Sequence, residues 1–160
     1  MRRCADVARL AILCSAVAFL ATGDGASALM AVLVLGPSVA ARLVRVHPAL
    51  DLVFTLALGA AAVTRPFGGG DTLPHLVLPL LAGPVLYVGL TRLGVVARPA
   101  GLVTFFGVLA LGVLWELVES SADAALGTGY SQGYDDTASD LLNDTIAAAA
   151  SGVLVGAWYR

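Results

Sequence analysis

Acidic side chains at helical spacing are the residues of this chain best suited to chemistry. Asp136, Asp140 and Asp144 recur every four residues in a chain of 160 residues that is 59% hydrophobic and only 12% charged. Residues three or four positions apart lie on one face of a helix. The same spacing relates further acids, so the candidate metal-ligating carboxylates are Asp71, Glu116, Glu119, Asp123, Asp136, Asp140 and Asp144.

One histidine belongs with these acids, because His75 follows Asp71 by four residues. Carboxylates held close together repel one another and need protons, cations or water around them. Carboxylates with one imidazole suit Mg, Mn, Fe, Ca or Zn. We therefore predict a site for a divalent metal ion, with His75, Glu116 and Glu119 as candidate catalytic residues and Glu119 as the base. Protonated carboxyls in a proton relay or a cation pathway are the alternative.

The elements that must position these residues are membrane helices. The mean hydropathy is +0.90, and long apolar runs alternate with short polar breaks, as in a polytopic membrane protein. The runs lack the period-two alternation of a membrane barrel. The prediction is an all-α helical bundle in one membrane domain, 1–160, with six spans at about 7–22, 26–41, 48–64, 72–91, 100–123 and 137–159. The net charge of −2 gives no indication of nucleic-acid binding.

Arginine positions predict the orientation of these spans. If six spans alternate, eight of the nine basic residues fall on one side and only Arg65 falls on the other. The positive-inside rule then places both termini in the cytoplasm and the acidic helix ends outside. As an alternative for residues 1–28, Arg2-Arg3, an apolar core and Ala26-Ser27-Ala28 are also typical of a cleavable signal peptide.

Some of the polar residues have purely structural interpretations. Thr137 and Asp140 fit a capping box that opens the last span, and Asp135 and Asp136 favour a helix N-terminus. Asp71 and Asp123 can likewise be a helix cap and a solvated surface residue, and Asp51 can pair with Arg45. Pro74, Pro79 and Pro84 free backbone carbonyls in the fourth span.

A family resemblance follows from these motifs. Asp71-x3-His75, Trp115-Glu116-x2-Glu119-x3-Asp123 and Asp136-Thr137-x2-Asp140-x3-Asp144, within a core region of about 48–155, resemble the YjdF-like bacterial inner-membrane proteins. More loosely, the chain is similar to the VanZ-like proteins, a likeness that implicates His75, Glu116, Asp140 and Asn143 or Asp144. The first resemblance implies a multi-pass protein of the bacterial inner membrane but no particular reaction.

Three functions remain open from the sequence. The first is a metal-dependent hydrolase or transferase that acts on a lipid-linked or envelope substrate, with GTGYSQGY (127–134) as a lid. The second is a cation- or proton-coupled transporter, and the third is a membrane scaffold without catalysis. A polar site confined to one side of the membrane favours the enzyme, whereas a continuous polar path favours the transporter.

Overall fold

The chain folds into α-helices throughout the part that the structure describes. This structure is a computed structural model that describes residues 1–64, 72–95 and 99–159. In these ranges the helices are α1 (Arg2–Ala21), α2 (Gly25–Leu43), α3 (Pro48–Thr64), α4 (Thr72–Arg92), α5 (Ala100–Leu126) and α6 (Tyr134–Trp158). Five of them are long and apolar enough to cross a membrane, and α3 is a shorter apolar helix of 17 residues. The predicted all-helical membrane fold is confirmed.

Local signals explain several helix ends. Asp24 caps α2 by accepting a hydrogen bond of 2.9 Å from the Ser27 N–H, and hydrogen bonds from Ser27 lower the pKa of Asp24. Pro48 occupies the first position of α3, where its missing N–H costs nothing. Gly127 ends α5 in the left-handed conformation, with φ 65°.

The start of α6 differs from the predicted capping box. The helix begins at Tyr134, and Thr137 lies inside its first turns with its N–H bonded to the carbonyl of Gly133. Asp136 instead accepts a hydrogen bond of 3.0 Å from the N–H of Gln132. The capping-box prediction is therefore wrong, because the helix begins one turn earlier, with Gly133 at the N-cap position.

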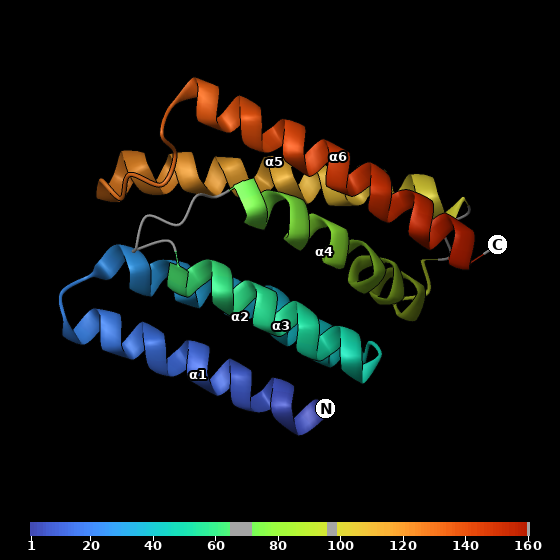
Figure 1. The fold of residues 1–160 in the computed structure, drawn as a ribbon, viewed down its shortest axis with the longest axis horizontal. Coiled ribbons are helices and arrows are strands. Elements are labelled where there is room, and N and C mark those ends of the chain that lie inside the picture. The colour runs from blue at the N-terminus through green and yellow to red at the C-terminus, as the bar shows by residue number, and fades with distance from the viewer. Residues whose placement is uncertain (65–71, 96–98, 160) are drawn as a thin grey trace. The chain divides into compact units, whose positions relative to one another are not determined.

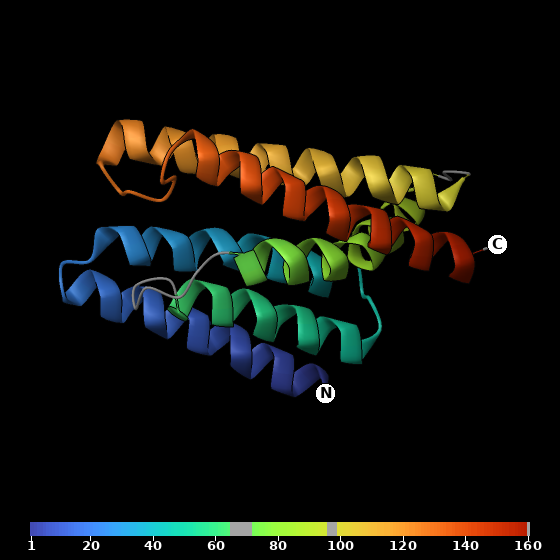
Figure 2. The same cartoon turned by 45° about the horizontal axis from the view of Figure 1, so that its top comes forward.

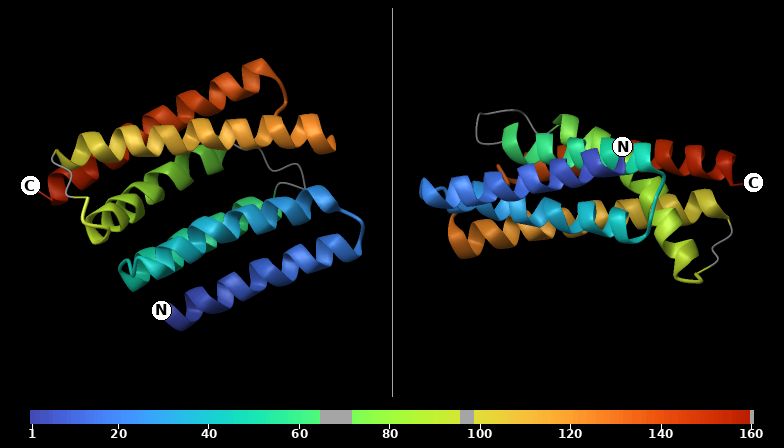
Figure 3. Two further views of the ribbon diagram at one scale, coloured as in Figure 1. Left: turned by 180° about the vertical axis from the view of Figure 1, so that it is seen from behind. Right: turned by 90° about the horizontal axis from the view of Figure 1, so that it is seen from below.

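The helices form two compact units, Met1–Asp71 and Thr72–Arg160. In the first unit α1, α2 and α3 pack against one another, each antiparallel to the one before (Figures 1 and 3). In the second unit α4, α5 and α6 do the same, and α5 runs beside α6 (Figure 2). The single domain over 1–160 expected from the sequence stays a prediction.

A buried arginine joins the three helices of the first unit. Arg9 on α1 donates to the carbonyl and hydroxyl of Ser38 on α2, at 2.8 Å each. It also forms an ion pair with Asp51 and donates to Thr55 at 3.1 Å, both on α3. Ser38 and Thr55 are themselves 2.9 Å apart, oxygen to oxygen. These four side chains are buried, so each polar group has its partner within the unit.

Small residues bring the helices of the second unit close together. A Cβ atom added to Gly101 on α5 would lie 2.7 Å from the carbonyl oxygen of Gly152 on α6, and the reverse holds equally. Ser151 donates a hydrogen bond of 3.0 Å to the carbonyl of Leu80 on α4. Leu80 lies four residues before Pro84, whose missing N–H frees that carbonyl. The prediction that the prolines of this span free carbonyls is confirmed at this position.

Candidate functional site

One face of α5 and one face of α6 carry the buried acids of the second unit. The buried residues of α5 follow a spacing of three and four and include Thr104, Val108, Gly112, Glu116 and Glu119. Those of α6 include Asp140, Asp144, Ala147, Ala148 and Ser151. His75 is the buried polar residue near the start of α4. The helical spacing that the sequence predicted therefore places Glu116, Glu119, Asp140 and Asp144 on the inner faces of their helices.

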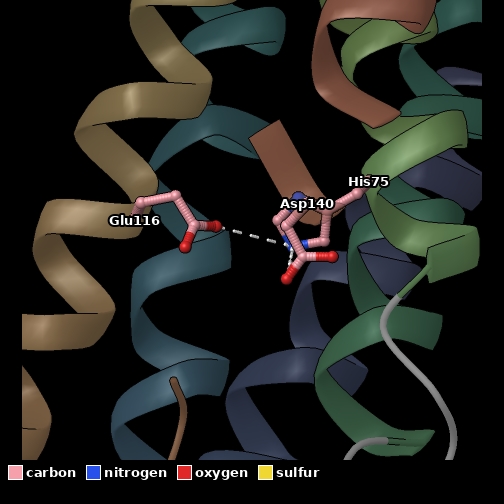
Figure 4. A group of neighbouring side chains, drawn as sticks. All are labelled: His75, Glu116 and Asp140. Carbon is pink, nitrogen blue, oxygen red and sulfur yellow. Dashed lines mark ion pairs between the residues drawn. The ribbon is translucent and has the colours of Figure 1, made fainter. Parts of the chain in front are cut away.

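His75 contacts three of these carboxylates, one from α5 and two from α6. Its Nδ1 lies 3.0 Å from Oδ1 of Asp144. Its Nε2 lies 3.6 Å from Oδ2 of Asp140 and 4.0 Å from Oε1 of Glu116. Figure 4 shows the Glu116 carboxylate pointing across towards His75 and Asp140. The structure thus brings His75, Glu116, Asp140 and Asp144 together.

Asp144 stands on the opposite side of the imidazole from the other two acids. An ionised carboxylate only accepts hydrogen bonds, so Nδ1 carries the proton in this contact. A neutral His75 then has its lone pair on Nε2, which faces Glu116 and Asp140. This is the arrangement by which a carboxylate orients a metal-binding histidine.

Gly112 makes room for Asp144. A Cβ atom at Gly112 would lie 3.0 Å from Cγ of Asp144 and closer still to Oδ2. Real Cβ atoms do not approach other atoms this closely, so any larger residue displaces the Asp144 carboxylate or separates α5 from α6. The absence of a side chain at Gly112 therefore leaves room for the Asp144 carboxylate that contacts Nδ1 of His75.

Glu116 has one carboxylate oxygen aimed into the cluster. Its side chain is buried, and Oε1 has no hydrogen-bond partner among the described residues. One potential ligand atom each from His75, Glu116 and Asp140 lies within 4.8 Å of the other two. A buried, incompletely bonded oxygen beside two more donor atoms fits a metal ion.

Glu119 is buried one helical turn further towards the C-terminal end of α5, with a relative exposure of 1%. It engages other groups of the chain, but it is not among the three residues whose ligand atoms come together. Its role as a base stays a prediction.

Asp123 has a different environment from the one predicted for a metal ligand. Its carboxylate accepts hydrogen bonds from the N–H groups of Tyr130, at 2.6 Å, and Ser131, at 2.8 Å, and from the Thr128 hydroxyl. Asp123 therefore fastens the loop between α5 and α6 to the end of α5.

The remaining predicted acids lie away from His75 or outside the described residues. Asp136 accepts a hydrogen bond from the N–H of Gln132, and Asp135 is exposed at the start of α6. Asp71 lies outside the described residues. Sequence reasoning missed the network around Arg9, although an arginine within an apolar run is a signal for a buried partner.

Comparisons with known proteins agree with this architecture. A family model described as "Predicted membrane protein (DUF2238)" matches residues 7–160. No curated protein and no solved structure matches the chain at a significant level. The family match confirms the resemblance to the YjdF-like proteins, and the looser VanZ-like similarity stays a prediction. The match covers nearly the whole chain, including His75, Glu116, Asp140 and Asp144, and the chain therefore belongs to this DUF2238 family of predicted membrane proteins.

Proposed function

We propose that the second unit binds one divalent cation between His75, Glu116 and Asp140. The observation that carries this proposal is Oε1 of Glu116, which is buried, makes no hydrogen bond to the described residues and lies 4.0 Å from Nε2 of His75. A buried charge without compensation is expensive, so a carboxylate in this position indicates a cation. The third ligand atom, on Asp140, is 3.6 Å from the same nitrogen.

The ligand set favours a transition metal over Mg or Ca. Imidazole nitrogen suits Zn and Fe, and carboxylate oxygen also suits Mn, whereas Mg and Ca prefer oxygen ligands alone. Bonds of about 2.0–2.2 Å to one ion place its ligand atoms about 3–3.5 Å apart. The separations of 3.6 and 4.0 Å are close to this spacing. Small side-chain shifts thus suffice to close the site around Mn²⁺, Fe²⁺ or Zn²⁺.

The same proposal extends to metal-assisted hydrolysis or group transfer on a lipid-linked or envelope substrate. A bound divalent ion polarises a carbonyl or phosphoryl oxygen or acidifies a water molecule. Glu119, one turn away from Glu116, is the candidate base. Support for an enzyme rather than a transporter comes from how far the buried acids extend along α5 and α6. Buried Val108 comes before the acids on α5, and buried Ala147 and Ala148 come after them on α6, so the acidic face does not continue along either helix.

We also propose that the protein lies in the bacterial inner membrane with the C-terminal end of α5 on the outer side. The support is the distribution of arginines, eight of which share one side if the spans alternate. A membrane-impermeant maleimide tests this with D135C in a C4A/C14A background. Labelling of intact cells supports the orientation, and labelling only after lysis contradicts it.

Metal content of the full-length protein in detergent is the direct test of the ion site. Protein loaded with Mn²⁺ or Zn²⁺ and then desalted should retain about one equivalent, and H75Q, E116Q and D140N should retain almost none. The control for the acids is D135N, because Asp135 is an exposed aspartate of α6. The control for the imidazole is H47Q, because His47 is exposed in the other unit.

Equal retention of metal by the wild type and H75Q would overturn the ion site. If the site is occupied, wild-type proteoliposomes containing a metal-sensitive dye separate the remaining functions. An enzyme leaves the dye signal unchanged, whereas uptake that E116Q abolishes would establish transport in place of catalysis.

A further inference from the structure

Four arginines gather at one end of the first unit. Arg2 and Arg3 open α1, and Arg42 and Arg45 lie in and just after the last turn of α2. Because α1 and α2 are antiparallel, these two helix ends lie side by side (Figure 3). An ion pair of 3.1 Å between Oδ1 of Asp6 and Nε of Arg42 joins them directly. We refer to the four arginines as the basic end.

The basic end has little negative charge to balance it. Three acids occur within residues 1–64. Asp51 is buried in an ion pair with another arginine, and Asp24 caps α2 at the opposite end of that helix. Of these three acids, Asp6 alone lies among the four arginines, and the side chain of Arg42 beside it is still 38% exposed. The basic end therefore presents net positive charge at the surface.

The backbone at Arg45 is strained in a way that matched turns of the same chain avoid. The helices α1, α2 and α4 all end in a turn in which two successive N–H groups donate to carbonyls three and five residues earlier. The first of these two residues has a positive φ, at Gly23 (83°), Arg45 (55°) and Gly94 (78°). Glycine adopts this left-handed conformation routinely, whereas a residue with a Cβ atom pays for it.

This strain indicates a function for the exposed side chain of Arg45, because a glycine would end α2 at lower cost. The position of the turn indicates which function. Helix α2 is long and apolar enough to cross a membrane, and Arg45 follows its last residue, Leu43, by two positions. Residues just beyond such a span lie at the level of the lipid headgroups.

We propose that the basic end of the first unit is a docking surface for the headgroup of an anionic phospholipid. A guanidinium group matches a phosphate with parallel N–H donors, and arginines next to a membrane span attract anionic lipid. Asp6 accepts from Nε of Arg42, one of the five N–H donors of that guanidinium, and holds the group at the surface. The proposal depends neither on the cation site nor on the orientation of the protein in the cell.

The test is thermal unfolding of the full-length protein in nanodiscs, followed by circular dichroism. Discs of phosphatidylcholine alone are compared with discs that contain added phosphatidylglycerol, and both faces of a disc carry the same lipids. Phosphatidylglycerol should raise the unfolding midpoint of the wild type, because a ligand of the folded state stabilises it. R45G should lose about 2–4 °C of this gain, and R2Q/R3Q should lose at least as much.

The same R45G protein separates a binding role of the side chain from a folding role. In phosphatidylcholine alone R45G should unfold at a higher temperature than the wild type, because glycine relieves the strain at this turn. The substitution is therefore expected to act in opposite directions in the two kinds of disc. A lower midpoint of R45G in phosphatidylcholine would show that the arginine serves folding, and would overturn the proposal.

The matched control is R92Q, because Arg92 is an exposed arginine in the last turn of α4, in the other unit. R92Q should keep the wild-type gain from phosphatidylglycerol. A loss as large as that of R45G would mean general attraction between arginines and anionic lipid, and would overturn a site at the basic end. No gain in the wild type would overturn it as well.

Two further measurements identify the ligand. Native mass spectrometry from detergent should show more phosphatidylglycerol than phosphatidylcholine retained by the wild type, and this preference should be lost in R2Q/R3Q. Equal retention of the two lipids by the wild type would overturn the proposal even if a variant folds poorly. Inorganic phosphate added to phosphatidylcholine discs should leave the unfolding midpoint unchanged. Stabilisation as large as that by phosphatidylglycerol would indicate a site for free phosphate in place of a lipid headgroup.

Discussion

The two units of the molecule each bury carboxylates in an apolar helix packing, but they surround them differently. In the first unit Asp51 forms an ion pair with Arg9, and the same arginine donates to Ser38 and Thr55. In the second unit, within 72–95 and 99–159, the basic side chain beside the acids is His75, which contacts Glu116, Asp140 and Asp144. Arg92 of that unit lies at the end of α4, about 25 Å along the helix axis from His75 at ~1.5 Å per residue.

This difference separates a structural polar cluster from the cluster that we propose binds a cation. A buried carboxylate that is paired with an arginine has its charge compensated within the protein. Removing either partner leaves an uncompensated buried charge. In the second cluster, three carboxylates surround one imidazole among the residues that the structure describes. The first cluster therefore stabilises its unit, whereas the second is the proposed cation site, and functional sites commonly cost stability.

The largest expected effect is the loss of the arginine in the first unit. R9M should lower the free energy of unfolding by about 3–5 kcal/mol, because Asp51 remains buried without its ion pair. Unfolding in mixed detergent, followed by circular dichroism, measures this change. R42M is the control, since Arg42 is half-exposed in its ion pair with Asp6 and should cost less than about 1 kcal/mol. An R9M protein as stable as R42M would mean that the network is not structural.

A smaller loss is expected from a methyl group at Gly112. G112A should destabilise the protein by about 1–3 kcal/mol, because the added Cβ would overlap the Asp144 carboxylate. It should also weaken cation binding, since Asp144 orients His75. Unfolding and Mn²⁺ titration of the same preparation measure both effects. G25A, where an added Cβ meets nothing within 4 Å, should be close to neutral.

Replacing one buried acid in each unit by its amide should change the free energy of unfolding in opposite directions. Without metal, E116Q should raise the free energy of unfolding by about 1 kcal/mol, because it removes a buried charge beside other carboxylates. D51N should lower it, because Arg9 then loses its counter-ion. Parallel unfolding curves of the two variants in the presence of a chelator decide the sign. Destabilisation by both substitutions would show that Glu116 is already satisfied by the protein.

The smallest expected effect concerns the carbonyl that Pro84 frees on α4. S151A removes the hydrogen bond from Ser151 to Leu80 and should cost about 0.6 kcal/mol, a usual value between membrane helices. S15A removes a hydroxyl that donates to Ala11 of its own helix and should cost less. The two variants are compared by the same unfolding measurement. An S15A protein that loses as much as S151A would indicate that the interhelical bond adds nothing.

Several features of the site were predictable from spacing alone. Glu116 and Glu119 on one helix, and Asp140 and Asp144 on the next, are indeed buried on the inner faces of α5 and α6. Helical periodicity fixes the direction in which a residue points from its own helix. The partner of Asp123 was not predictable in this way, because it lies in the irregular loop after Gly127.

The sequence by itself determined the helices, their apolar character and the family, because run length and periodicity are properties of one segment at a time. Only the tertiary structure decided that Asp144 contacts Nδ1 of His75, whereas Glu116 and Asp140 lie beside Nε2. That choice depends on how far each helix is displaced along its neighbour. The displacement is set by close approaches at Gly101, Gly112 and Gly152, which periodicity within one helix does not encode.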